Sequence, residues 1–233
     1  MSQPASTKRV KLPPPPGWAS PALQGLAFWI GHRRALYSGS PLGESALVAE
    51  LCNLIHTHLP KTKQLRCEVQ YADLKAKAKW LGPLARLDLL VSEHADDPKA
   101  SPVPIAALEV KRAGAAKSLI VRDLKRLAAL KVAQPGIRAF LVVVAEASLP
   151  KDYVNKDGEA DTRSHAIPET AFRWKVRRVL KASHTFKKER IKAAQYVCLI
   201  EVLPRITPKP PLKLRILIKR KIKPATSSRA KKP

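Results

Sequence analysis

The chain has 233 residues, with 44 Lys or Arg against 18 Asp or Glu, which gives a formal net charge of +26. Hydrophobic residues make up 45% of the chain and aromatic residues 5%, so we expect a globular core built mainly of Leu, Val, Ala and Ile. No apolar run approaches the roughly 20 residues of a membrane span and no secretion signal is recognisable, so composition excludes an integral membrane protein and disfavours secretion. Three cysteines without metal-ligand spacing exclude a disulfide scaffold. We expect a reduced, cytoplasmic protein, associated with the nucleoid or, in a eukaryote, nuclear.

The positive charge is concentrated at the two ends of the chain. Residues 205–233 hold eleven basic residues and no acidic one, and residues 1–16 hold three basic residues and no acidic one, which leaves +12 between them. Because four consecutive prolines prevent a helix, we expect residues 1–16 to be an extended or disordered basic tail. Residues 17–203 are then expected to form one domain, followed by a basic tail, rich in Pro and Lys, over residues 204–233.

The first element that the sequence indicates is a helix. Ser40 followed by Pro41 provides a cap and then a ring already set for the first helical turn, so we expect a helix from there to about residue 59. Three runs typical of strands follow it. They lie at residues 66–71, 85–92 and 105–111, and we expect them to form a meander.

A second helix and a buried strand come next. We expect the helix over residues 118–133, and a crossover to a parallel strand over residues 138–145, which is almost wholly apolar. Residues 172–180 fit either a helix or a strand, and residues 195–203 fit a strand. The order helix, three strands, helix, strand predicts an α/β fold in which helices flank a mixed central sheet, with additional C-terminal elements.

Two carboxylates lie inside otherwise apolar strands. Asp88 stands in the sequence ARLDLLV, and Glu109 stands in IAALEVK. A carboxylate in a buried strand is unfavourable unless it is paired or bound to a metal. Side chains alternate across a strand, so Glu109 and Lys111 share one face, and Asp88 meets them if the two strands are neighbours. Two carboxylates beside an ammonium suit one Mg²⁺ ion and one water, because hard divalent cations prefer oxygen ligands.

A third carboxylate, Glu44, is expected near this pair. On a helical wheel Glu44 falls within about 40° of the centre of the apolar face that includes Leu47 and Leu51, whereas Glu50 lies about 85° away. We therefore expect Glu44 to point toward the sheet near the start of its helix, and Glu50 to lie at the border of the apolar face.

Together these residues resemble the PD-(D/E)xK nuclease superfamily, which has the restriction-endonuclease-like fold. That family has a helix with Glu, a strand ending near Asp, Glu-x-Lys on the next strand, and then a helix and a strand. The matching residues, within residues 38–145, are Glu44, Asp88 and Glu109-Val110-Lys111. The run from Arg86 to Asp88 is similar to the family's Arg-x-Asp form, although Leu87 stands where the motif has Pro.

The resemblance implies a role for each residue. Asp88 and Glu109 would hold Mg²⁺ or Mn²⁺, with the backbone carbonyl of Val110 as a further ligand. Lys111 would orient the attacking water or help to deprotonate it. Glu44 would support the metal directly or through water, or complete a second site. A residue of the following helix often assists in this family, and the candidates here are Asp123, Lys125 and Arg126.

Basic residues are the candidates for contact with nucleic acid, since Lys and Arg neutralise phosphates. On the helix over residues 118–133 they are Arg122, Lys125 and Arg126, with a solvated face as the alternative. A denser cluster, interleaved with Phe172 and Trp174, either contacts nucleic acid or is merely exposed; it comprises Arg173, Lys175, Arg177, Arg178 and Lys181. In the C-terminal tail, part of which has the alternation of a strand, the candidates are Lys213, Arg215, Lys219, Arg220 and Lys221.

The sequence thus favours a Mg²⁺-dependent endonuclease that hydrolyses DNA phosphodiester bonds, and the resemblance implies a role in defence against foreign DNA or in DNA repair. We expect nucleic acid as the partner, DNA rather than RNA, with a homodimer left open and no membrane association. Charge alone would also attract an anionic membrane surface or a ribosome. The two alternatives are a non-catalytic nucleic-acid-binding protein and a basic structural component of a ribonucleoprotein complex.

Overall fold

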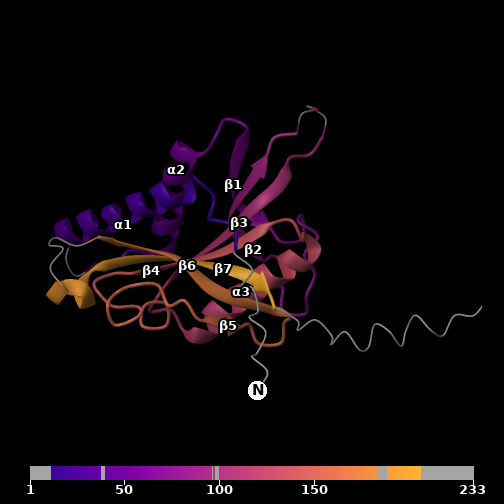
Figure 1. The fold of residues 1–233 in the computed structure, drawn as a ribbon. Helices are drawn as coiled ribbons and strands as arrows, with labels where there is room; N and C mark the ends of the chain where they lie inside the picture. The colour runs from indigo at the N-terminus through magenta and orange to yellow at the C-terminus, as the bar shows by residue number, and fades with distance from the viewer. Residues whose placement is uncertain (1–11, 38–39, 96, 98–99, 183–187, 206–233) are drawn as a thin grey trace, which may run out of the picture.

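The structure, a computed structural model, describes residues 12–37, 40–95, 97, 100–182 and 188–205 (Figure 1). Its helices are α1 (Ala19–Leu36), α2 (Glu44–His58), α3 (Lys117–Ala133) and the short 3-10 helix η1 (Lys188–Ala193). Its strands are β1 (Lys63–Gln70), β2 (Arg86–Glu93), β3 (Val103–Arg112), β4 (Arg138–Ala145), β5 (Ser164–Ala166), β6 (Phe172–Ala182) and β7 (Gln195–Pro204). None of the helices in this part of the chain is both long enough and apolar enough to cross a membrane.

All of these strands belong to one mixed sheet, in the order β1-β2-β3-β4-β7-β6-β5. β3 and β4 are parallel and are joined by α3, whereas the other neighbouring strands are antiparallel. The predicted α/β class with a mixed sheet is therefore confirmed. From α2 to β4 the elements follow the predicted order of helix, three strands, helix and strand.

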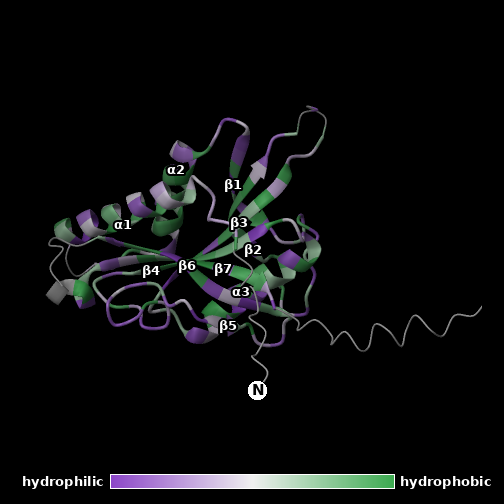
Figure 2. Ribbon diagram, viewed as in Figure 1, coloured by the Kyte–Doolittle hydropathy of each residue, from purple (hydrophilic) through white to green (hydrophobic). Residues whose placement is uncertain are grey.

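The sheet separates two hydrophobic clusters. α1 and α2 pack on one face, and α3 with the loops after β1 and β4 packs on the other (Figure 1). Both α1 and α2 show alternating hydrophilic and hydrophobic bands, as expected for helices with one face on a core (Figure 2). β4 lies between the layers: Leu141 and Val143 face the α3 side, while Phe140 and Val142 face the α1 side. This two-sided burial explains why β4 is apolar throughout.

The structure differs from the sequence prediction at the start of α2, and it identifies the type of the one segment that the sequence left ambiguous. α2 begins at Glu44 rather than near Ser40, because Gly43 before it has an extended backbone, with φ −66° and ψ 156°. Glu44 is therefore the first helical residue. The segment that fitted a helix or a strand is the strand β6, paired with β7 along its length.

The helix α1 was not predicted from the sequence. Its apolar residues contact both α2 and the sheet, so they are spread around the helix rather than gathered on one narrow face. Pro21 lies in its first turn, where the backbone N–H has no helical partner to lose. Gly25 allows α2 to approach closely, since a Cβ there would lie 2.9 Å from a methyl carbon of Leu54.

A buried ion network ties the N-terminal segment to the sheet. Glu201 of β7 accepts hydrogen bonds from Arg138 of β4 and Arg177 of β6. The two guanidinium groups also donate to the backbone carbonyls of Pro14 and Pro13. The segment before α1 therefore makes contacts with the domain at residues that the sequence assigned to a free tail. The rest of the expected N-terminal tail, and the C-terminal tail from residue 206, lie outside the described residues.

We expect Glu201→Gln to lower the free energy of unfolding by about 3 kcal/mol, because it leaves two clustered guanidinium groups without a counter-charge in a buried place. The matched control is Glu93→Gln, which breaks an exposed pair with Lys63 and should cost about 1 kcal/mol or less. Urea denaturation measures both. Equal losses for the two variants would show that the buried network does not stabilise the fold.

Candidate functional site

The predicted carboxylates meet where β2 and β3 separate. The pairing of these strands extends from Glu93–Val103 to Leu89–Leu108 and stops one residue before Asp88 and Glu109. Beyond that point the backbone N–H of Val110 donates to a carboxylate oxygen of Asp88, at 2.7 Å. A side chain of β2 thus takes over the bond that a backbone carbonyl makes in a regular ladder.

Asp88 and Glu109 are electrostatically coupled: a side-chain hydrogen bond between them raises the pKa of Glu109 and lowers that of Asp88. Glu109 is 2% exposed and also accepts a 2.5 Å hydrogen bond from the hydroxyl of Tyr71. Burial raises the pKa of Glu109 well above its ordinary value of 4.5, and the nearby charges of Asp88 and Asp123 raise it further. Burial also raises the pKa of Asp88, more than the Val110 amide and Lys111 lower it. The pKa values of both carboxyl groups are therefore shifted upward, mainly by burial.

Lys111 connects α2 and α3 to this pair of strands. Its ammonium lies 2.7 Å from Glu44, at the start of α2, and 3.3 Å from Asp123, which is completely buried in α3. Burial alone lowers the pKa of Lys111, but the hydrogen bond to Glu44 and the charge of Asp123 outweigh it and raise this pKa. Lys111 therefore remains a cation.

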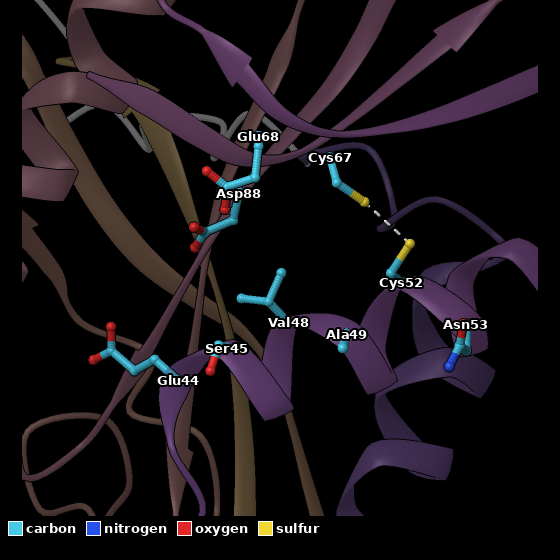
Figure 3. A pocket seen from close by; sticks show the side chains of 9 residues that line it. All are labelled: Glu44, Ser45, Val48, Ala49, Cys52, Asn53, Cys67, Glu68 and Asp88. Atoms are coloured by element: carbon cyan, nitrogen blue, oxygen red, sulfur yellow. Dashed lines mark hydrogen bonds between the residues drawn. The ribbon is translucent and has the colours of Figure 1, made fainter. Parts of the chain in front are cut away.

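An open cleft of about 530 Å³ lies between α2 on one side and β1 with the start of β2 on the other. The charged residues among its described lining are all acidic, namely Glu44, Glu68 and Asp88. Figure 3 shows the side chains of these three residues gathered at one end of the cleft. An acidic cleft in a chain with a net charge of +26 is a place where a cation would be held.

Glu68 reaches the cleft because the backbone of β1 is irregular there. It has φ 54°, in the left-handed region that residues other than glycine seldom adopt. The ladder of β1 and β2 pairs Cys67 with Leu89 and Val69 with Leu87, but Glu68 does not pair with Asp88. Cys67 and Glu68 are adjacent and would point to opposite faces of a regular strand, yet both line the cleft.

The donor set fits a hard divalent cation with few protein ligands. Within the described residues, no group of three or more His, Cys, Asp or Glu side chains is arranged to hold a metal ion. Asp88 and Glu109 nevertheless lie within hydrogen-bonding reach of each other, so these two carboxylates are the candidates to hold such a cation. Mg²⁺ is often bound by one or two carboxylates and keeps several waters, so a carbonyl such as that of Val110 and solvent can complete its coordination.

The structure brings together the four residues that the sequence singled out: Glu44, Asp88, Glu109 and Lys111. It also distinguishes among the three candidates on α3, because Asp123 contacts Lys111 whereas Lys125 instead pairs with Glu169. Tyr71 and Glu68 were missed. Neither lies in a motif: Tyr71 follows the end of β1, and the contact of Glu68 depends on a local backbone distortion.

The three basic candidates on α3 differ in how freely their side chains can contact a phosphate group. Arg122 is exposed, and its ion pair with Asp123, at 3.8 Å, is the longest that the three basic residues make. Arg126 donates to Asp123 at 3.1 Å and Lys125 lies 3.0 Å from Glu169, so both are engaged in ion pairs. Arg122 is accordingly the residue of the three that is best placed to contact phosphate.

The second basic cluster is separate from the carboxylates. β6 is separated from β3 by β4 and β7, which at about 4.8 Å per strand corresponds to roughly 14 Å. Arg177 is buried against Glu201 and is not available for phosphate, which corrects the sequence interpretation of this residue. Arg178 is exposed, and Lys181, near the end of β6, pairs with Glu159. Arg173 donates to Pro204 and Ser164, and Lys175 is half-buried. The tail candidates, Lys213, Arg215, Lys219, Arg220 and Lys221, lie outside the described residues.

Comparisons with protein-family models, with curated proteins and with solved structures each found no match. The case for a function therefore depends on the chemistry of the site and on the arrangement of the elements that hold it.

The raised pKa of Glu109 leads to a prediction about pH and metal. A buried carboxyl with a raised pKa binds a proton more tightly in the folded than in the unfolded state, so stability without metal should fall as pH rises above about 4.5. The pKa of Asp88 is shifted in the same direction, and Lys111 titrates far above this range. Mg²⁺ or Mn²⁺ should compensate at neutral pH and raise the melting temperature by on the order of 5 °C at saturation.

Glu109→Gln tests this assignment because a neutral amide imitates the protonated carboxyl. The variant should show a flatter decline of melting temperature with pH and little stabilisation by Mg²⁺. Scanning calorimetry across pH 4 to 8, with Mg²⁺ or with chelator, measures both effects. A wild-type melting temperature that Mg²⁺ and Mn²⁺ leave unchanged would argue against a metal site.

Proposed function

We propose that the chain is a metal-dependent endonuclease that hydrolyses phosphodiester bonds in DNA and has the restriction-endonuclease-like fold. The order of elements from α2 to β4 supports the fold, together with the position of the carboxylates on adjacent strands. Defence against foreign DNA and DNA repair are the roles that this class of enzyme would fit.

The observation that carries the proposal is the hydrogen-bonded pair of Asp88 and Glu109, with Lys111 two residues further along β3. Buried carboxylates in contact with each other are unfavourable, and they contribute nothing to stability that two apolar residues would not. Their presence beside an acidic cleft, in a strongly basic chain, is explained if the protein holds a cation there and binds a polyanion around it.

Each residue then has a defined task. Asp88 and Glu109 hold the cation, which supplies charge neutralisation for phosphate and a lowered pKa for its bound water. Lys111 presents an ammonium to the phosphate or to the attacking water. Glu44 and Asp123 keep that ammonium charged and fix its position from opposite helical layers. Tyr71 orients Glu109 through its hydroxyl.

A non-catalytic nucleic-acid-binding protein is the second candidate. The observation that favours it is the double ion pair of Lys111, whose ammonium is shared between Glu44 and Asp123 and in this arrangement serves to neutralise them. In that case the basic surface binds nucleic acid and the carboxylates are structural. Cleavage and binding assays distinguish the two candidates, since binding without cleavage is the expected result for the second.

We expect Asp88→Asn and Glu109→Gln each to reduce Mg²⁺-dependent cleavage of duplex DNA by about 100-fold or more, while leaving the fold and DNA affinity unchanged. Both variants keep the size and hydrogen-bonding capacity of the side chain, so Val110 and Tyr71 retain their partners. The matched control is Asp73→Asn, an exposed carboxylate away from the cleft, which should cut like the parent. Plasmid, linear duplex and single-stranded substrates with Mg²⁺ or chelator are the measurement. Wild-type rates in both variants would refute the assignment.

We expect substitution of Glu44 to affect cleavage less than substitution of Asp88 or Glu109. Glu44→Gln removes one of the two negative charges that hold Lys111, so it should raise the Mg²⁺ concentration needed for half-maximal cleavage several-fold. The control is Glu50→Gln on the same helix, which should change little. The readout is the Mg²⁺ dependence of the initial rate for both variants. A sensitive Glu50 with an insensitive Glu44 would exclude the contribution that we assign to Glu44.

A further inference from the structure

Two cysteines form part of the wall of the acidic cleft. Cys52 lies on α2 and Cys67 on β1, and their sulfur atoms are 3.2 Å apart, within hydrogen-bond contact. Figure 3 shows both side chains pointing toward each other at the end of the cleft away from Glu44. The two residues are 15 positions apart in the sequence and join different elements, so nothing in local chain geometry requires this contact.

The contact depends on the distorted backbone of β1. Glu68, with φ 54°, interrupts the alternation of the strand, so that Cys67 and Glu68 both face the cleft. Cys67 is exposed and Cys52 is half-buried, so a small oxidant in solvent reaches the pair. The third cysteine, Cys198, is buried in β7 and serves as an internal control.

We infer that Cys52 and Cys67 form a reversible disulfide that fixes α2 to β1 under oxidising conditions. With hydrogen peroxide as the oxidant, the two S–H bonds break and one S–S bond forms. The two electrons reduce the peroxide O–O bond, and both protons leave in two molecules of water. Thiol reductants reverse the step by disulfide exchange.

In the reduced protein the Cys67 thiol is protonated at neutral pH. Burial, followed by the hydrogen bond with Cys52, raises the pKa of the Cys67 thiol to about 11. Because the thiolate is the reactive form, we expect the oxidation of Cys67 by peroxide to be slow at neutral pH.

The disulfide would restrain the element that carries Glu44. Cys52 lies eight residues after Glu44 on α2, about 12 Å along the helix. Closing a loop of this size limits the unfolded chain, so the oxidised protein should melt at a temperature higher by on the order of 5 °C. This inference does not depend on the proposed cleavage chemistry, because the bond and its effect on stability are measured without any nucleic acid.

The test uses the full-length protein, treated with hydrogen peroxide and then denatured for thiol titration. We expect the number of free thiols to fall from three to one, the mass to fall by about 2 Da, and a peptide joining Cys52 to Cys67 to appear in a non-reducing digest. Cys198→Ser should fall from two thiols to none. Cys52→Ser should keep the Cys198 thiol and lose the rise in melting temperature.

Three results would overturn the inference. They are three titratable thiols that persist after oxidant treatment, a disulfide-linked dimer on a non-reducing gel, or oxygen added to a single cysteine instead of loss of two hydrogens. All three results are measured on the protein with its wild-type sequence, so a variant that failed to fold would not prevent a decision.

Discussion

The ammonium of Lys111 is the interaction on which the arrangement of the site depends. It is the cation that joins the central strand β3 to α2 through Glu44 and to α3 through Asp123, although these helices cover opposite faces of the sheet. Asp123 is completely buried, and an uncompensated carboxylate there would cost several kcal/mol. Lys111 shares this compensation with Arg126 and Arg122 of α3. Among these three partners Lys111 is the one that lies on the sheet, and its charge also acts on Asp88.

The second constraint is the separation of β2 from β3. A continuous ladder would use the Val110 amide for a backbone carbonyl and would leave no room for the side chain of Asp88 at that position. Ending the pairing at Leu89 and Leu108 frees this amide for the carboxylate. The left-handed backbone of Glu68 on the other side of β2 widens the same irregularity, at a cost of about 1–2 kcal/mol. Strain that the rest of the sheet compensates is therefore concentrated beside the cleft.

Much of the core was predictable because it follows from short-range patterns. Alternation and apolar runs placed β1, β2, β3, β4 and β7 within a few residues, but they left β6 ambiguous and missed the short strand β5. The Glu109-Val110-Lys111 sequence placed two polar side chains on one face of β3. α1 was not predictable in this way, since its partners lie on two sides and include the distant β6 and β7. The contact of Tyr71 with Glu109 spans 38 residues, and it depends on a turn after β1 that has no periodic signal. The pairing of Arg177 with Glu201 was hidden for the same reason, because Arg177 lies at an irregularity of the ladder between β6 and β7 that no sequence pattern marks.

Acidic and basic side chains lie on different surfaces of the protein, a separation that the net charge of the whole chain does not show. The cleft presents carboxylates, which would repel a phosphate chain, whereas Arg122 and Arg178 present positive charge on surfaces away from it. If the chain is the nuclease that we propose, a polyanion held by such surfaces would meet no favourable charge inside the cleft until a divalent cation bound to Asp88 and Glu109. The cation would then govern the last step of approach, while the basic surfaces would govern affinity. Under this proposal nucleic acid would remain bound to the protein without metal, and the carboxylate pair would become compatible with phosphate only after the cation had entered.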